Sequence, residues 1–254
     1  MRRKRYNIKF PANGCHDVAQ DQVYFHLTED GEERRFRFHD YSEIYKRPGL
    51  YEQLFYERLK CTSPDKLREI LSDVLHKNRQ EMSELRLLDL GAGNGMVADE
   101  LHVARAVGVD ISPEAEMACE RDRPGIYDAY YVADFCNLSA DEERELREWQ
   151  FNCLTCVAAL GFGDIPTKAF ITAFNLLGNE SWVAFNIKET FLQESDTSGF
   201  SLLVKWLLMS DILEIHHMER YRHRISIDGE SLFYYMLVGK KRADISNEKL
   251  EEFA

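Results

Sequence analysis

The sequence of 254 residues has few prolines and no long apolar run. Six prolines and 14 glycines are too few for a collagen-like or low-complexity chain, and 44% hydrophobic residues suffice for a globular core. No apolar stretch approaches the roughly 20 residues that a membrane-spanning helix needs. The charged start at residues 1–11 is not followed by the apolar segment of a secretory signal. We therefore expect a globular, cytoplasmic protein with no membrane partner.

Positive charge is also in short supply. The chain has 32 Lys and Arg against 44 Asp and Glu, which gives a net charge of −12. A field of this sign repels the phosphate backbone of nucleic acids. We therefore expect no nucleic-acid partner.

The six cysteines are too sparse and too irregularly spaced for a disulfide scaffold. Cys153 and Cys156 form a C-x-x-C pair, but no second pair or paired-histidine motif follows at a distance suited to zinc. The pair lies inside an apolar run, which favours two buried thiols in a strand. The sequence therefore predicts no metal site.

Residues 1–80 have the pattern of an N-terminal extension made of a hairpin and helices. Alternating apolar residues flank a turn at Asp30–Gly31 and predict the hairpin: Val23, Phe25, Leu27, Phe36 and Phe38. Residues 50–59 carry apolar residues at helical spacing. Ser63 and Pro64 then supply the N-cap and first position of another helix, whose apolar stripe runs over residues 67–75.

Residues 81–243 alternate short apolar runs with amphipathic segments, a pattern typical of βα units and a parallel sheet. The expected strands span 85–90, 106–110, 129–133, 151–157 and 182–187. Helix signals lie between them: Ser112 before Pro113, a capping box of Ser139 with Glu142, and Gly178 after an apolar stripe.

The C-terminal third predicts an antiparallel hairpin. Residues 213–227 and 231–239 read as its strands, and Asp228, Gly229 and Glu230 as its turn. The expected fold is therefore an α/β Rossmann-like fold with a seven-stranded mixed sheet, mostly parallel, and helices on both faces. Residues 244–254 read as a solvated tail.

The segment LLDLGAGNGMVADEL, residues 87–101, carries the strongest functional signal. Glycines 91, 93 and 95 follow a strand, so the backbone can approach a ligand closely, and the next helix N-terminus favours an anionic group. The following strand ends in Asp110, nineteen residues after Gly91, where a carboxylate can accept both hydroxyls of a ribose. This arrangement predicts a ligand that contains a nucleoside.

The spacing argues against a dinucleotide, because the G-x-G-x-x-G fingerprint needs glycine where the chain has Met96. An hhDhGxGxG motif, with acids at the ends of the next two strands, resembles the class I S-adenosylmethionine-dependent methyltransferases. The matching residues are Asp89, Gly91, Gly93, Gly95, Asp110 and Asp134. The segments VGVDISPE and YVADF are similar to the small-molecule branch of that family.

The resemblance implies S-adenosylmethionine as cofactor and a role for each matching residue. The turn would cradle the methionine portion with Gly91, Ala92, Gly93, Asn94 and Gly95. Asp89 would lie near its amino group, Asp110 would hold the ribose, and Ile111 would lie against adenine. Asp134 would accept from the adenine amine beside Phe135, with Ala158 or Ala159 as the floor. In the alternative reading, Asp89 only caps a turn and Phe135 belongs to the core.

The reaction asks little of the protein, since a sulfonium is an activated methyl donor and holding the acceptor in line in a dry pocket supplies most of the catalysis. A general base is optional, and His216, His217 and His223 are candidates by residue type. Polar residues crowded on an antiparallel hairpin more often form its solvated face. Residues 38–59 occupy the position of a lid and carry Tyr41, Tyr45, Tyr51 and Tyr56. Tyr45 and Tyr51 could contact cofactor or substrate, or could simply pack the lid.

The loop after the fourth strand lacks the Asn/Asp-Pro-Pro-Tyr/Phe motif of amide and exocyclic-amine methyltransferases and reads ALGFGDIP instead. This departure disfavours DNA adenine and glutamine-amide acceptors. Phe162 and Asp164, in the loop 160–166, could form a wall facing the acceptor, or the loop could be an ordinary connection.

The resulting hypothesis is methyl transfer from S-adenosylmethionine to a small-molecule acceptor. Three alternatives stay open: a protein methyltransferase, a non-catalytic S-adenosylmethionine-binding or regulatory protein, and an NAD-dependent oxidoreductase, for which no convincing catalytic pair is present. The N-terminal extension could serve as a lid or could form a homodimer.

Overall fold

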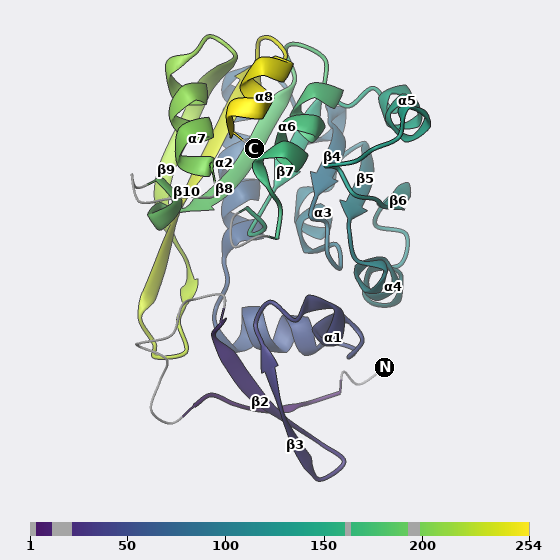
Figure 1. Ribbon diagram of the computed structural model, residues 1–254, viewed down its shortest axis with the longest axis vertical. Helices are drawn as coiled ribbons and strands as arrows, with labels where there is room; N and C mark the ends of the chain where they lie inside the picture. The colour runs from purple at the N-terminus through teal and green to yellow at the C-terminus, as the bar shows by residue number, and fades with distance from the viewer. Residues whose placement is uncertain (1–3, 12–21, 161–163, 193–198, 254) are drawn as a thin grey trace.

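The computed structural model describes residues 4–11, 22–160, 164–192 and 199–253. Figure 1 shows an α/β core with a smaller N-terminal part, in purple and dark blue, against one end of it. The core holds a seven-stranded mixed sheet with helices on both faces, so the predicted fold class is confirmed. In the described part of the chain, no helix is long and apolar enough to cross a membrane.

The sheet has the strand order β6-β5-β4-β7-β8-β10-β9. Its parallel strands are β4 (Arg86–Leu90), β5 (Arg105–Asp110), β6 (Ala129–Val132), β7 (Cys153–Cys156) and β8 (Trp182–Lys188). The antiparallel hairpin is β9 (Leu213–Ile225) and β10 (Ser231–Lys241). The order reverses between β4 and β7, and ligands of such sheets bind at the carboxyl ends of the strands beside this point.

Helices cover the sheet in two layers. Leu87 packs in the apolar cluster with α2 (Ser63–Lys77) and α3 (Met96–Leu101), whereas Leu88 packs with α6 (Thr167–Leu176) on the other face. This alternation follows from the two-residue period of a strand. The remaining core helices are α4 (Pro113–Asp122), α5 (Ala140–Glu148), α7 (Phe200–Met209) and α8 (Asn247–Phe253). Short 3-10 turns lie at η3 (Met82–Glu84) and η4 (Glu189–Leu192).

The N-terminal part has its own apolar cluster. The predicted hairpin is confirmed as β2 (Tyr24–Glu29) and β3 (Glu32–Arg37), joined through Asp30 and Gly31 with positive φ. The short strand β1 (Asn7–Lys9), which the sequence did not predict, pairs with β2. The helices are α1 (Tyr41–Tyr45) and η2 (Glu52–Arg58); the predicted helix over 50–59 thus has π geometry. A homodimer formed through this part stays a prediction.

One predicted helix signal is wrong. Thr62, not Ser63, precedes α2, because the Ser63 hydroxyl is engaged by Tyr221 and His223 at 2.6 Å each. The predicted end of α6 is confirmed, since Leu177 leaves the helix with extended angles and Gly178 follows it, although Gly178 is not in a left-handed conformation. The capping box of Ser139 with Glu142 is confirmed.

The solvated tail expected at residues 244–254 is also wrong over its described residues. Residues 247–253 form α8, and the Phe253 side chain is only 2% exposed. Its ring centroid lies 5.6 Å from that of Trp206, and its carbonyl accepts a 2.6 Å hydrogen bond from Thr167. The sequence hid this helix because its few apolar residues stand among charges.

We expect Phe253→Ala to lower the free energy of unfolding by about 3 kcal/mol, since it removes a buried ring and leaves a cavity. Urea unfolding followed by circular dichroism measures this change. Glu251→Ala, at an exposed position of the same helix, is the matched control and should leave the midpoint unchanged. Equal midpoints for both variants would contradict the packing of α8.

Candidate functional site

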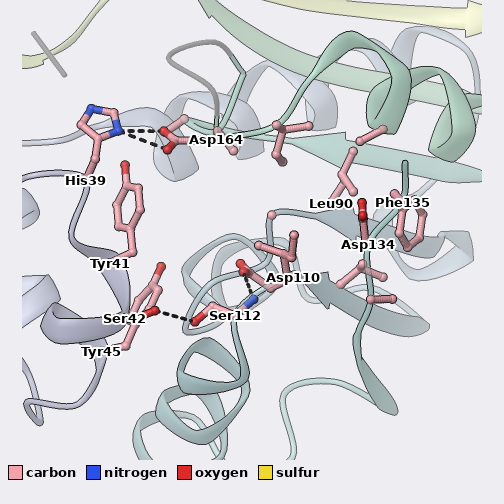
Figure 2. Close-up of a pocket in the computed structure, with 18 of the residues that line it drawn as sticks. His39, Tyr41, Ser42, Tyr45, Leu90, Asp110, Ser112, Asp134, Phe135 and Asp164 are labelled. Atoms are coloured by element: carbon pink, nitrogen blue, oxygen red, sulfur yellow. Dashed lines mark hydrogen bonds and ion pairs between the residues drawn. The ribbon is translucent and has the colours of Figure 1, made fainter. Parts of the chain in front are cut away.

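A cavity of about 480 Å³, here called the large cavity, opens at the carboxyl ends of β4, β5 and β6. One wall comes from the N-terminal part, over His39–Tyr45, and the other from the loops that follow the strands (Figure 2). This volume lies in the range of small-molecule sites. The cavity therefore sits where the switch in strand order predicts a ligand.

Asp110 ends β5 and joins two loops at the cavity wall. Its carboxylate accepts 3.0 Å hydrogen bonds from the backbone N–H groups of Gly93 and Ser112. Burial raises the pKa of Asp110, although these N–H groups oppose the shift. The next residue, Ile111, lines the cavity with 67% of its surface exposed, so it offers an uncovered apolar face.

Asp134 and Phe135 follow β6 and complete this side of the cavity. The Asp134 carboxylate accepts hydrogen bonds from the Asn137 side chain at 2.7 Å and the Cys136 N–H at 2.9 Å, and the Asn137 bond lowers its pKa. Phe135 is buried while its ring lines the cavity. The structure thus brings Asp110, Ile111, Asp134 and Phe135 around one space, as predicted.

The glycine turn lines a second, smaller cavity of about 30 Å³, here called the glycine cavity. Gly93 has φ +54°, and a Cβ there would lie 2.5 Å from the Tyr45 hydroxyl oxygen, so only glycine fits. Asn94 is buried; its amide donates to Glu52 at 3.0 Å, whereas its Oδ1 finds no hydrogen-bond partner among the described residues. Gly91 and Ala92 complete the turn in the same wall.

Glu52 connects the turn to the N-terminal part through a buried ion pair. Its carboxylate lies 3.0 Å from Arg123, and both side chains are at most 8% exposed. Arg123 also donates to the carbonyl of Asn94 at 3.0 Å. The sequence did not identify this pair, because its members lie 71 residues apart and match no motif.

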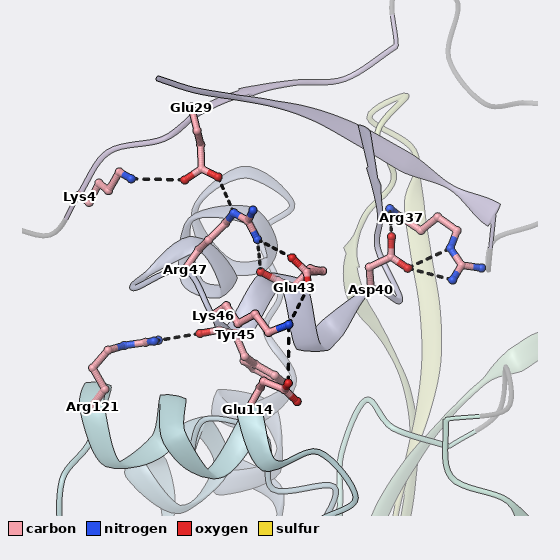
Figure 3. A network of polar contacts seen from close by, with 10 residues as sticks. All are labelled: Lys4, Glu29, Arg37, Asp40, Glu43, Tyr45, Lys46, Arg47, Glu114 and Arg121. Carbon is pink, nitrogen blue, oxygen red and sulfur yellow. Dashed lines mark hydrogen bonds and ion pairs between the residues drawn. The ribbon is translucent and has the colours of Figure 1, made fainter. Parts of the chain in front are cut away.

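Polar contacts hold α1 against α4 (Figure 3). Arg121 donates to the carbonyl of Tyr45 at 2.9 Å, and Lys46 pairs with Glu114 at 3.7 Å. Arg47 extends the network to Glu29 of β2 at 2.6 Å. These contacts fix α1 as a cover over the large cavity.

Two residues predicted to contact the cofactor, Asp89 and Gly95, do not line these cavities, and their contact with it stays a prediction. The buried Asp89 carboxylate accepts 2.6 Å hydrogen bonds from Thr155 and Tyr127, inside the sheet, and does not line the cavities. Gly95 faces the opposite side of the turn, where a Cβ would lie 3.0 Å from Ile126 and 3.1 Å from Cys119. Both residues shape the turn from behind.

A third cavity of about 40 Å³, here called the histidine cavity, lies between the N-terminal part and β9. His39 and Asp164 line both it and the large cavity, and His39 Nδ1 lies 3.0 Å from a carboxylate oxygen of Asp164 (Figure 2). Asp164 was predicted as a wall residue; Phe162 lies outside the described residues. His39 was missed, because a single histidine after a hairpin carries no local signal.

Tyr51 and Ala158 line all three cavities. Ala158 has φ +58°, and its N–H donates to Asn186 at 2.6 Å. Tyr45 lines two of the cavities and its ring centroid lies 5.2 Å from that of Tyr51, so these tyrosines both pack the lid and face the site. Burial raises the pKa of Tyr45 well above its ordinary value, which keeps the hydroxyl protonated.

The three histidines predicted as candidate general bases lie in different surroundings. His216 packs against Trp182 with ring centroids 4.9 Å apart, and His217 pairs with Glu219 at 3.2 Å. Neither lines the cavities, so the structure gives no support to a substrate contact for either. His223 does line the histidine cavity, and burial lowers its pKa well below the ordinary value, which leaves it neutral.

The C-x-x-C pair behaves as predicted. Cys153 and Cys156 are fully buried in β7, and burial raises the pKa of both thiols. Over the described residues, no group of three His, Cys, Asp or Glu side chains could hold a metal ion.

A family of known proteins and several solved structures are similar to this chain. Residues 88–185 match the family described as methyltransferase domain. The N-methyltransferase NodS from Bradyrhizobium japonicum, in complex with S-adenosyl-L-homocysteine, superposes with a TM-score of 0.55 at 13% identity, covering 81% of this chain and 98% of that one. A SAM-dependent methyltransferase from Anabaena variabilis gives 0.50 at 15% identity, covering 80% and 93%. No curated protein sequence matches the chain.

We expect the stability of the protein to depend on pH through Asp89. Burial raises the pKa of Asp89 from 3.8 to about 6, so folding favours its protonated form. Its contribution to stability is therefore present below pH 4 and is lost as the pH rises through 6. Relative to Asp89→Asn, which cannot ionise, the natural protein should lose about 2 kcal/mol of unfolding free energy between pH 4 and pH 7.

Urea unfolding of both proteins at pH 4, 5, 6 and 7 measures this difference. Asp141→Asn, at an exposed position of α5, serves as the control and should show no such trend. A stability difference between Asp89→Asn and the natural protein that is the same at every pH would contradict the assignment.

Proposed function

We propose that this chain, which carries a class I S-adenosylmethionine-dependent methyltransferase domain, transfers the methyl group of S-adenosylmethionine to a small-molecule acceptor. The observation that carries the proposal is that three cavities share Tyr51 and Ala158 as lining residues. The sulfonium of S-adenosylmethionine carries an adenosyl group, the amino acid chain and the methyl group that is transferred. In this proposal the adenosyl group occupies the large cavity, the amino acid end lies at the glycine cavity, and the methyl group points toward an acceptor in the histidine cavity.

The residues of the large cavity suit an adenosyl group. Asp110 presents a carboxylate that can accept the ribose hydroxyls, as acids at this strand end do in nucleoside sites. The exposed face of Ile111 and the ring of Phe135 offer apolar contacts for adenine. Asp134, whose lowered pKa keeps it ionised, can accept from the exocyclic amine.

The glycine cavity suits the amino acid end of the cofactor. The orphaned Asn94 Oδ1 can accept from an ammonium group, which would satisfy a buried acceptor that now lacks a partner. Tyr45 and Tyr51 can donate to a carboxylate, because burial raises the pKa of both hydroxyls. Gly93 leaves the space that any side chain would fill.

S-adenosylmethionine, when bound, supplies an electrophilic methyl group. The protein contributes by holding the acceptor and by excluding water, and such positioning accounts for several kcal/mol of the barrier. His39 is placed to accept the acceptor proton, and Asp164 orients its ring through Nδ1. The acceptor is small in this proposal because the histidine cavity lies under the N-terminal part, with β9 as its other wall.

We expect calorimetric titration to show micromolar binding of S-adenosylmethionine and S-adenosylhomocysteine, and no binding of NADH. Asp110→Ala should weaken the adenosyl ligands at least tenfold, the cost of losing a buried charged hydrogen bond. Asp141→Ala is the control at an exposed carboxylate and should bind as the natural protein does.

His39→Gln adds a second readout to this experiment. It should leave the affinity for S-adenosylhomocysteine unchanged and lower turnover of an acceptor roughly 100-fold, as expected for loss of a general base. Binding of NADH would favour the oxidoreductase. Binding of the adenosyl ligands without turnover of any acceptor would favour a non-catalytic protein.

A further inference from the structure

We propose that the methyl acceptor is a small aromatic carboxylic acid whose carboxylate binds Arg224 in the histidine cavity. This inference rests on the proposed function and names its substrate class. It starts from Arg224, a residue near the end of β9 whose role the methyl transfer itself does not explain.

Arg224 is a buried cation. It is only 6% exposed, yet it lines the histidine cavity. Its side chain donates to the carbonyl of Ile225 at 3.0 Å and lies over the ring of Phe38, 5.6 Å from the centroid. Among the residues that the structure describes, no carboxylate forms an ion pair with it. Burying an unpaired charge is costly, so an anionic partner is the missing element of this site.

A β-bulge in β9 lies next to Arg224 at the histidine cavity. Opposite Leu232 and Phe233 of β10 stand Arg224 and Arg222, so His223 is an extra residue in a β-bulge. In a regular strand, neighbouring residues face opposite sides. The bulge instead buries His223 and Arg224 together, and bulges commonly re-aim side chains beside active sites.

Asp164, the acid that lines this cavity, forms its ion pair with His39 and not with Arg224. Asp164 is engaged by His39, whose Nδ1 lies 3.0 and 3.2 Å from its two oxygens. A ligand carboxylate can instead pair with Arg224, since a guanidinium binds both carboxylate oxygens in parallel. A phosphate dianion suits the site less well than a carboxylate monoanion, because the Asp164 carboxylate already places a negative charge in this cavity.

The walls of the histidine cavity favour an aromatic body. Ring side chains line the cavity together with Arg224: Phe38, His39, Tyr41, Tyr51, Phe55, His223 and Tyr234. Flat rings stack or pack edge-on against such walls. His39 lines both this cavity and the large cavity, so a hydroxyl or amine on the same ring would lie on the side of the proposed proton acceptor.

Methyl transfer to this acceptor needs only the cofactor, the acceptor and His39. The acceptor oxygen or nitrogen forms a bond to the methyl carbon while the S–CH3 bond breaks, and that electron pair remains on sulfur as a thioether. The acceptor proton passes to His39 and then to solvent. No oxidant or reductant is required.

The test compares three probes that share one ring: benzoate, benzamide and phenyl phosphate. Each is titrated by calorimetry into the natural protein saturated with S-adenosylhomocysteine. We expect benzoate to bind at least tenfold more tightly than the other two. Arg224→Gln should abolish this preference without changing the affinity for S-adenosylhomocysteine, whereas Arg222→Gln, exposed on the same strand, should retain it.

Equal binding of benzoate and benzamide, a preference for phenyl phosphate, or a benzoate preference that survives Arg224→Gln would each overturn the inference. If Arg224→Gln fails to fold, Arg224→Lys and the comparison of probes on the natural protein still decide. Failure of S-adenosylhomocysteine to bind the natural protein would refute the proposed function instead, so the two failures are distinguishable.

Discussion

The buried ion pair of Glu52 with Arg123 is the interaction on which the site depends. Glu52 belongs to η2 of the N-terminal part, Arg123 follows α4, and both contact Asn94 in the glycine turn. A buried pair of this kind is held only where both charges stay together, because removing one leaves the other uncompensated. It therefore holds the N-terminal part, the glycine turn and α4 in fixed positions relative to one another. The cavities lie between these parts and depend on those positions.

The lid and the sheet contribute different chemistry to these cavities. The sheet supplies acids at its carboxyl edge, where backbone N–H groups hold Asp110 in place. The N-terminal part supplies hydroxyls, rings and His39, and it lines the large cavity together with these acids. Neither part forms a closed site alone. The tyrosines of the lid thus stabilise its packing and line the site at the same time, so the two roles weighed from the sequence are not exclusive.

The sequence predicted what local patterns encode. The strands of the core, including those of the C-terminal hairpin, all lie within two residues of the predicted ranges, because buried strands appear as short apolar runs. Asp110 and Asp134 were placed at the cavity because strand ends meet at one edge of a parallel sheet. The surroundings of Asp89 and Gly95 were not predicted, since a motif gives positions along the chain and not the direction in which a side chain points.

The rest of the site depends on contacts between distant segments. His39 meets Asp164 across 125 residues, and Arg224 reaches the same cavity through a bulge that no residue type announces. The direct test of the account is a crystal structure of the protein with S-adenosylhomocysteine. We expect adenosine beside Asp110 and Ile111, homocysteine in the glycine cavity, sulfur at Tyr51 and Ala158, and the histidine cavity free of the ligand. Homocysteine in the histidine cavity, or the ligand bound elsewhere, would contradict it.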